Sequence, residues 1–259
     1  MESIQDLHGL PELSAASTAK VKAAAVEGAR AATSDGAAPA PAVAPGEHPG
    51  VERWPVKTGT DLDVASVGQN TVKGEKLGAG VVATTVEELI ALPRPANMPA
   101  LHSSFPKNSF YQNHRAPSSE TTVWKITATI TEAKLEQDGD YHLVLKGDSG
   151  KTMIGEIPNP EAAFVKNADW RAQIKEARDA MDQKLGRSLK ALDFAPEEMA
   201  PPTEDRFAAG PVEEEEAVMT KIGSKATITG VGFFDSSHGQ TGVAPNAIEL
   251  HPIFSITFH

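Results

Sequence analysis

The order of the periodic segments predicts a mainly β fold with one principal helix. The expected architecture is an oligonucleotide/oligosaccharide-binding (OB)-like five-stranded barrel of order β-β-β-α-β-β, wrapped by an irregular N-terminal extension. Residues 124–158 contain three strand-like segments, a helical segment follows at 168–186, and two further strand-like segments complete the chain. The alternation of the first strand shifts near Thr131, as expected of a strand that bulges to turn a barrel corner. A long polar connection separates the last two strands, where this fold often places binding residues.

Turn residues separate the predicted strands. Asp138-Gly139-Asp140 and Gly147-Asp148-Ser149-Gly150 are turn sequences, and Pro158 ends the third strand. The five predicted strands are 124–135, Tyr141–Leu145, Thr152–Ile157, Ala226–Phe234 and Ile248–Phe258.

The principal helix is predicted from one apolar stripe. Asn167 or Asp169 is the expected N-cap, and Gly186 the expected end. Spacings of three and four place the stripe on one side of the helix, facing a core. Its members are Trp170, Ile174, Ala177, Met181 and Leu185.

Composition divides the chain into three parts. Residues 1–50, rich in Ala, Pro, Ser and Gly, are expected to form a disordered tail with a weak helix at 17–32. Residues 51–119 show little periodicity apart from a short helical segment at 86–92, so an irregular extension packing on the barrel is expected. Residues 120–259 are expected to form the barrel itself.

The negative charge is concentrated in one insertion of the barrel. The formal net charge is −11, of which residues 191–218 carry −8, because they hold nine acidic residues and one arginine. The rest of the chain is therefore near neutral at −3. Nucleic acid is compatible with such a surface as a partner, although no basic stripe favours it.

The chain has no segment near the ~18 apolar residues of a membrane span. Residues 1–8 lack the basic start and apolar stretch of a secretory signal, so a cytoplasmic location is expected. The absence of cysteine excludes disulfides, thiolate catalysis and Cys-ligated zinc.

The loop 235–247 carries the main candidate site, because it is longer than an ordinary hairpin connection and rich in polar side chains. His238 lies next to Gly239 and could act as a general base or metal ligand, or could bind the backbone and hold the loop's shape. Gln240 and Asn246 are candidate ligand-binding residues; Asn246, after Pro245, also suits a turn.

Two residues of the last strand extend this site. Glu249 and His251 are two positions apart, so they share one face of the strand, which is expected to be exposed. With Asp235 and His238 they form a candidate catalytic set, and His238, Glu249 and His251 a candidate metal set. Imidazole and carboxylate suit zinc or another divalent metal in a site without thiols. No His-x3-His spacing specifies a metal.

A second pair is predicted on neighbouring strands. His142 and Glu156 could meet across the second and third strands if the register permits, as a structural or a catalytic pair. We expect His238 to lie within about 10 Å of His142, His251 or Glu249, because one polar cluster is easier to organise than isolated half-buried groups.

Four segments resemble a widespread family of uncharacterised bacterial proteins: Arg-Trp-Pro-Val-Lys-Thr-Gly-Thr-Asp at 53–61, Asp140–Leu145, Thr152–Pro158 and Gly230–Pro252. The resemblance implies that 51–119 belongs to the same unit as the barrel, and that secretion is an alternative location. It implies no activity and no residue roles. The Ala/Pro-rich N-terminus and the acidic insertion depart from it.

Three functions remain open from the sequence. The first is a ligand-binding OB-like module of unknown ligand, with its site at loop 235–247 beside His142 and Glu156. The second is a metal-dependent hydrolase, most plausibly a phosphodiesterase or nuclease, that uses the candidate catalytic set. The third is a non-catalytic structural or interaction protein. Phosphate-binding, dinucleotide-binding and His-Glu-x-x-His motifs are absent.

Overall fold

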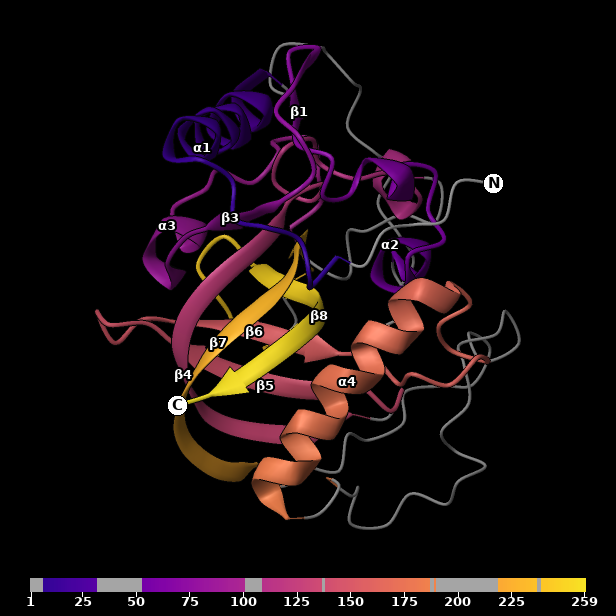
Figure 1. Ribbon diagram of the computed structural model, residues 1–259, viewed down its shortest axis with the longest axis vertical. Coiled ribbons are helices and arrows are strands. Elements are labelled where there is room, and N and C mark those ends of the chain that lie inside the picture. Colours follow the sequence, from indigo (N-terminus) through magenta and orange to yellow (C-terminus); the bar gives the residue numbers. More distant parts are fainter. Residues whose placement is uncertain are drawn as a thin grey trace.

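The structure is a computed structural model with a mainly β architecture: a six-stranded mixed sheet and one principal helix beside it (Figure 1). Among the described residues, no helix is long and apolar enough to cross a membrane. The described residues are 7–31, 53–100, 109–136, 138–186, 189, 219–236 and 239–259.

The sheet has the strand order β3-β4-β5-β6-β8-β7, and β4 also pairs with β7. Its strands are β3 (Val81–Ala83), β4 (Val123–Leu135), β5 (Tyr141–Lys146), β6 (Thr152–Ile157), β7 (Thr220–Phe234) and β8 (Ile248–Phe258). The other elements are α1 (Ala15–Ala31), α2 (Trp54–Thr58), α3 (Val86–Ile90), α4 (Ala168–Leu185), the 3-10 helices η1 (Val64–Ser66) and η3 (Phe110–Gln112), and the hairpin strands β1 (Thr71–Val72) and β2 (Glu75–Lys76).

All five predicted strands lie in this one sheet, and each of them pairs with at least two others. The pairs β4–β5, β5–β6, β7–β8 and β4–β7 are antiparallel, whereas β6–β8 is parallel. The register of β4 shifts between Ile130 and Glu132 against both β5 and β7, which confirms the predicted irregularity near Thr131.

The predicted helix is confirmed as α4. The Asn167 side chain accepts a hydrogen bond from the Trp170 amide at its start, and Gly186 ends it in the left-handed conformation. The Trp170 ring packs edge-on against Phe254 of β8, with ring centroids 5.1 Å apart. The apolar stripe therefore faces the sheet.

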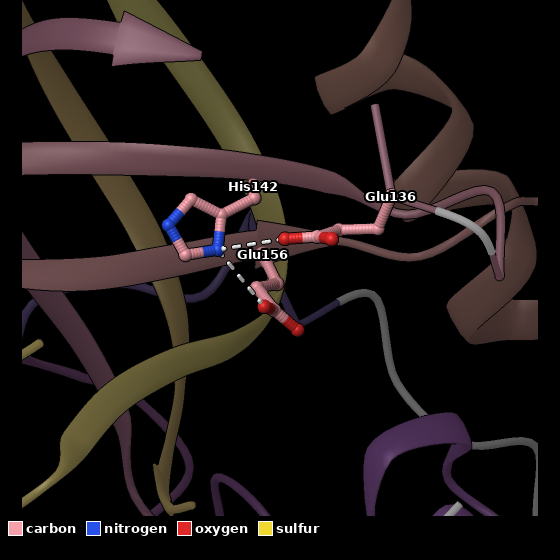
Figure 2. Close-up of side chains that lie close together, drawn as sticks. All are labelled: Glu136, His142 and Glu156. Carbon is pink, nitrogen blue, oxygen red and sulfur yellow. Dashed lines mark hydrogen bonds and ion pairs between the residues drawn. The ribbon is translucent and has the colours of Figure 1, made fainter. Parts of the chain in front are cut away.

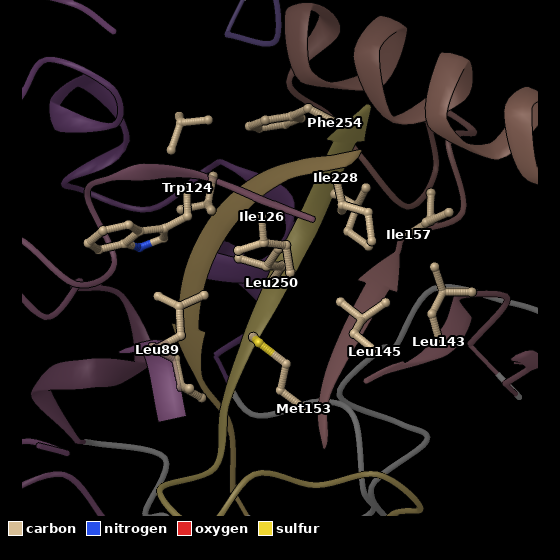
Figure 3. Close-up of a cluster of buried hydrophobic side chains, with 14 of the residues drawn as sticks. Leu89, Trp124, Ile126, Leu143, Leu145, Met153, Ile157, Ile228, Leu250 and Phe254 are labelled. Atoms are coloured by element: carbon tan, nitrogen blue, oxygen red, sulfur yellow. The ribbon is translucent and has the colours of Figure 1, made fainter. Parts of the chain in front are cut away.

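The core fills the space between the strands and α4 (Figure 3). Alternate residues of β4 point into it, because successive side chains of a strand face opposite sides. Burying each such aliphatic or aromatic side chain contributes about 1.5–3 kcal/mol. Buried members shown in Figure 3 include Trp124, Ile126, Leu143, Leu145, Met153, Ile157, Ile228, Leu250 and Phe254.

The disordered tail predicted for 1–50 is corrected for residues 7–31. They include helix α1, and Glu12 forms a parallel bridge with Val81 of β3. Leu7, Val21 and Ala25 are fully buried in the core. Single apolar contacts with distant elements stabilise a helix whose own sequence predicts only weak helicity. Residues 32–52 and the predicted acidic insertion 191–218 lie outside the described residues.

The extension is also more regular than its sequence predicts. Between 53 and 119 it forms α2, the β1–β2 hairpin, α3 at the expected place, and β3, which adds a parallel strand beside β4. Two buried ion pairs hold the extension together and connect it to the segment just before β4. Arg53 binds both oxygens of Glu120 at 2.7 and 2.8 Å, and Arg115 binds both oxygens of Asp61 at 3.0 and 2.7 Å.

Leu7→Ala is expected to lower the free energy of unfolding by about 2–5 kcal/mol, the usual cost of truncating a buried leucine. Leu62→Ala is the matched control, because Leu62 is 69% exposed, and it should cost less than about 0.5 kcal/mol. Urea denaturation measures both. Equal, small effects would show that residues 7–31 do not pack on the core.

Candidate metal centre

Three strands of the sheet bring two histidines and a glutamate together. His142 of β5 pairs directly with Glu156 of β6. Gly155 of β6 pairs with Leu250 of β8, so the next residues, Glu156 and His251, are neighbours as well. Both histidines are completely buried. The register therefore confirms that the predicted pair His142 and Glu156 meets, and it adds His251.

Glu156 contacts both histidines, one with each carboxylate oxygen. Its Oε1 lies 3.4 Å from His142 Nδ1, and its Oε2 lies 2.8 Å from His251 Nδ1. Glu136, directly after β4, places its Oε1 3.3 Å from His142 Nδ1 (Figure 2). Figure 2 shows Glu136 and Glu156 converging on this nitrogen from two sides.

The other nitrogen of His142 is held by the long loop. His142 Nε2 lies 2.9 Å from the main-chain oxygen of Thr241. A carbonyl can only accept, so Nε2 carries the proton and Nδ1 faces the carboxylates. Burial alone lowers the pKa of His142, but Glu156 and then Glu136 outweigh it, and the pKa lies above its ordinary value.

His251 has one nitrogen bound and one without a partner. Its Nδ1 donates to Glu156 and lies 3.2 Å from Glu249 Oε1. Its Nε2 is buried and has no hydrogen-bond partner among the described residues, and Asp140 Oδ2 is 3.8 Å away. Burial lowers the pKa of His251. Burial therefore favours the neutral ring, and because Nδ1 donates to Glu156, the lone pair of that neutral ring is on Nε2.

Carboxyl groups outnumber cationic groups around these histidines. Burial, then the charge of Glu156, raises the pKa of Asp138 to about 6. Burial and the neighbouring carboxylates hold the pKa values of Asp140 and Glu249 well above their ordinary range. Burial also opposes ionisation of Glu156, but hydrogen bonds from His142 and His251 hold its pKa well below the usual value. Such closely spaced carboxyl groups cannot all ionise without a cation.

Lys57 is the cation that the extension supplies. This residue of α2 is buried, with its Nζ 3.9 Å from Asp235 Oδ1 and 5.6 Å from the centre of the Phe233 ring. Its charge lowers the pKa values of Asp138, Asp140 and Glu249. The extension therefore takes part in the electrostatics of the cluster as well as in packing.

The structure separates the other predicted site residues. Gln240 Nε2 donates to Asp235 Oδ2 at 2.9 Å, at the edge of the cluster. Asn246 lies away from it: its amide donates to the carbonyls of Leu89 and Leu92 at the end of α3. His238 lies outside the described residues, so its predicted distance to the other histidines stays a prediction.

The exposed strand face predicted for Glu249 and His251 is corrected. Both side chains are buried. The Phe233 ring packs against His251, with ring centroids 5.4 Å apart, and Lys57 of α2 lies over the same Phe233 ring, so the extension covers this face. Glu136, Asp140 and Lys57 were not predicted as site residues. The only sequence signals for the last two were the Asp138-Gly139-Asp140 turn and the motif at 53–61.

The cluster contains two groups of metal-ligating side chains. One is Glu136, His142 and Glu156; the other is Asp140, Glu156 and His251. In each group one ligand atom per residue lies within 4.8 Å of the others. Two ligands on opposite sides of an ion with bonds of about 2.1 Å are about 4.2 Å apart, so each group can close on one ion with small movements.

Comparisons with models of protein families, with curated proteins and with solved structures gave no match. The resemblance of four segments to an uncharacterised bacterial family therefore stays a prediction.

Proposed function

We propose that this chain is a metal-binding module built on an OB-like barrel, and that its ligand is a divalent metal ion held by Asp140 and His251, with Glu156 orienting the His251 ring. The module corresponds to the ligand-binding function expected from the sequence. The proposal places its ligand inside the polar cluster where β5, β6 and β8 meet, instead of on the exposed part of loop 235–247.

The barrel is supported by the strand pairings. They run from β4 through β5, β6, β8 and β7 and return to β4. Five strands in the chain order β-β-β-α-β-β, with the third and fifth parallel, are the arrangement expected of an OB fold. The bulge of β4 suits a strand that must pair along both of its edges around a barrel.

The observation that carries the metal proposal is the buried His251 Nε2, which has no hydrogen-bond partner among the described residues. A buried polar atom without a partner costs about 1–3 kcal/mol, so an Nε2 that faces a carboxylate suits a metal ion as its partner. The bond from Nδ1 to Glu156 fixes the tautomer and the ring orientation, as carboxylates commonly do for metal-binding histidines. Imidazole and carboxylate ligands suit zinc and similar divalent ions.

The charge of the cluster supports the same conclusion. Buried carboxylates need a cation or a proton, and here the pKa values of three carboxyl groups are raised well above their usual range. A divalent ion would stabilise their ionised forms. Metal uptake should therefore release protons, and binding should strengthen as the pH rises.

His251→Gln is expected to abolish high-affinity zinc binding, measured by isothermal titration calorimetry after chelator treatment. The lost imidazole is the central ligand, and the loss of a residue that only hydrogen-bonds a metal ligand already weakens such sites about 10–100-fold. His8→Gln is the matched control, because His8 also pairs with a glutamate, Glu176, but at 2.9 Å on the surface. A wild-type protein that binds no zinc, manganese or cobalt would refute the proposal.

A metal-dependent hydrolase is the second candidate. An ion held by Asp140 and His251 would keep coordination positions open for water, and an open position for water is typical of catalytic zinc. Turnover of bis(p-nitrophenyl) phosphate by the metal-loaded protein, lost in His251→Gln, would favour a phosphodiesterase or nuclease. Metal binding without turnover of this ester, DNA or RNA would favour the non-catalytic module.

A further inference from the structure

We infer that the cluster binds a second divalent ion, held by Glu136, His142 and Glu156. The inference rests on the proposed function and adds to it a second site. Glu156 directs Oε1 toward His142, where it can bind the second ion, while its Oε2 accepts the hydrogen bond from His251 Nδ1 and so orients the ligand of the first ion. Glu156 therefore couples the two sites.

The distances around His142 match the spacing of ligands on a metal ion. Its Nδ1 lies 3.3 Å from Glu136 Oε1 and 3.4 Å from Glu156 Oε1. Both separations are longer than an ordinary N–H···O bond of about 2.7–3.2 Å. Neighbouring ligands of a tetrahedral ion with bonds of about 2.1 Å are about 3.4 Å apart. His142 Nδ1 therefore has the spacing of an adjacent ligand to each of the two oxygens, and one ligand atom of each residue lies within 4.8 Å of the others.

The orientation of His142 is fixed in the way that a metal ligand requires. The Thr241 carbonyl binds Nε2 at 2.9 Å and directs Nδ1 toward the two carboxylates. A backbone carbonyl on the second nitrogen is a common partner of metal-bound histidine. The long loop between β7 and β8 thus has a role that needs none of its own side chains: it orients a ligand of the second ion.

The two sites differ in access to solvent. The Glu136 side chain is 28% exposed and that of Glu156 14%, whereas Asp140 and His251 are buried. Ions can therefore enter at Glu136. The site of His142 should exchange its ion faster and bind it more weakly than the site of His251.

Lys134 competes for the second site. Its Nζ lies 3.0 Å from Glu136 Oε1, the same oxygen that faces His142. A second ion must displace this partly exposed ammonium group. Removing Lys134 therefore distinguishes a metal site from a purely structural network of ion pairs. A metal site should bind its ion more tightly without the competing ammonium group, whereas a structural network that needs Lys134 should bind it more weakly.

The test is a zinc titration of the chelator-treated protein, followed by native mass spectrometry and calorimetry. The wild type should bind two ions, and Glu136→Gln and His142→Gln should bind one. Lys134→Ala should bind the second ion about two- to fivefold more tightly, the effect of removing an exposed ion pair. His114→Gln, a control from a surface His–Asp pair of 3.0 Å, should still bind two.

Each result decides one question. If the wild type binds one ion and Glu136→Gln also binds one, the second site is overturned and the proposed function is left intact. Weaker binding of the second ion in Lys134→Ala would also overturn it. No ion in any variant would overturn the proposed function itself. Glu136 is partly exposed, so circular dichroism should show Glu136→Gln folded as the wild type.

Discussion

Arg53→Met is expected to lower the free energy of unfolding by about 3–5 kcal/mol, because it leaves the buried Glu120 carboxylate without its cation. The Arg53 guanidinium binds both oxygens of Glu120 and the main-chain oxygen of Phe234, at 2.9 Å. The loss should appear in urea denaturation at pH 7. Lys175→Met is the matched control, since its pair with Asp179 is exposed and should be worth less than about 1 kcal/mol. Equal effects of the two changes would contradict the structural role of Arg53.

The same pair predicts a pH dependence. Burial opposes ionisation of Glu120, but Arg53 and the amides of Ala116 and Phe234 outweigh it and hold its pKa below the ordinary 4.5. Because the folded pKa is lower than the unfolded one, Glu120 contributes stability above pH 4.5 that is lost as the pH falls through the folded value. The difference between wild type and Glu120→Gln should be largest near pH 7 and shrink in acid. A difference independent of pH would mean that Glu120 is not ionised.

Gly59→Ala should be the second strongly destabilising change. Gly59 ends α2 in the left-handed conformation, with φ of 70°, and a Cβ there would overlap the indole of Trp170. The left-handed backbone costs about 1–2 kcal/mol, and overpacking against a buried ring about 1–3 kcal/mol more. Thermal and urea unfolding measure the sum.

Gly74→Ala separates the cost of the left-handed backbone from the cost of the overlap with Trp170. Gly74 has φ of 81°, but nothing lies within 4 Å of the position of a Cβ. It shares the backbone strain of Gly59 without the overlap, so the difference between the variants measures the contact with Trp170. If both variants lose equal stability, the extension does not pack against α4 as described.

The strands and the main helix could be predicted because their signals are local. Alternation in β4 and the stripe from Trp170 to Met181 directly report which side of each element is buried. The cap at Asn167 and the left-handed Gly186 follow from residue type alone.

The extension could not be predicted in the same way, because single side chains with distant partners stabilise it. The buried amide of Asn70 donates to the carbonyls of Gly68, Gly78 and Gly80. Arg53 binds Glu120, 67 positions further along the chain. Neither contact produces a periodic pattern.

Only part of the candidate site could be predicted from the sequence. His142 and Glu156 meet because antiparallel register is regular, and Glu249 and His251 share a face because side chains alternate. Asp140 looked like an ordinary turn residue, and Lys57 lies in a helix of the extension. Tertiary structure decides which element covers a given face of a strand. The burial of His251 could therefore not be predicted from the sequence of β8 alone.

Anomalous diffraction from crystals grown with zinc, recorded on both sides of the zinc absorption edge, tests the central claim most directly. The account predicts an anomalous peak within about 2.0–2.2 Å of an imidazole nitrogen of His251 and a carboxylate oxygen of Asp140. A cluster without anomalous density at saturating zinc, with His251 Nε2 bound to water or protein instead, would contradict it.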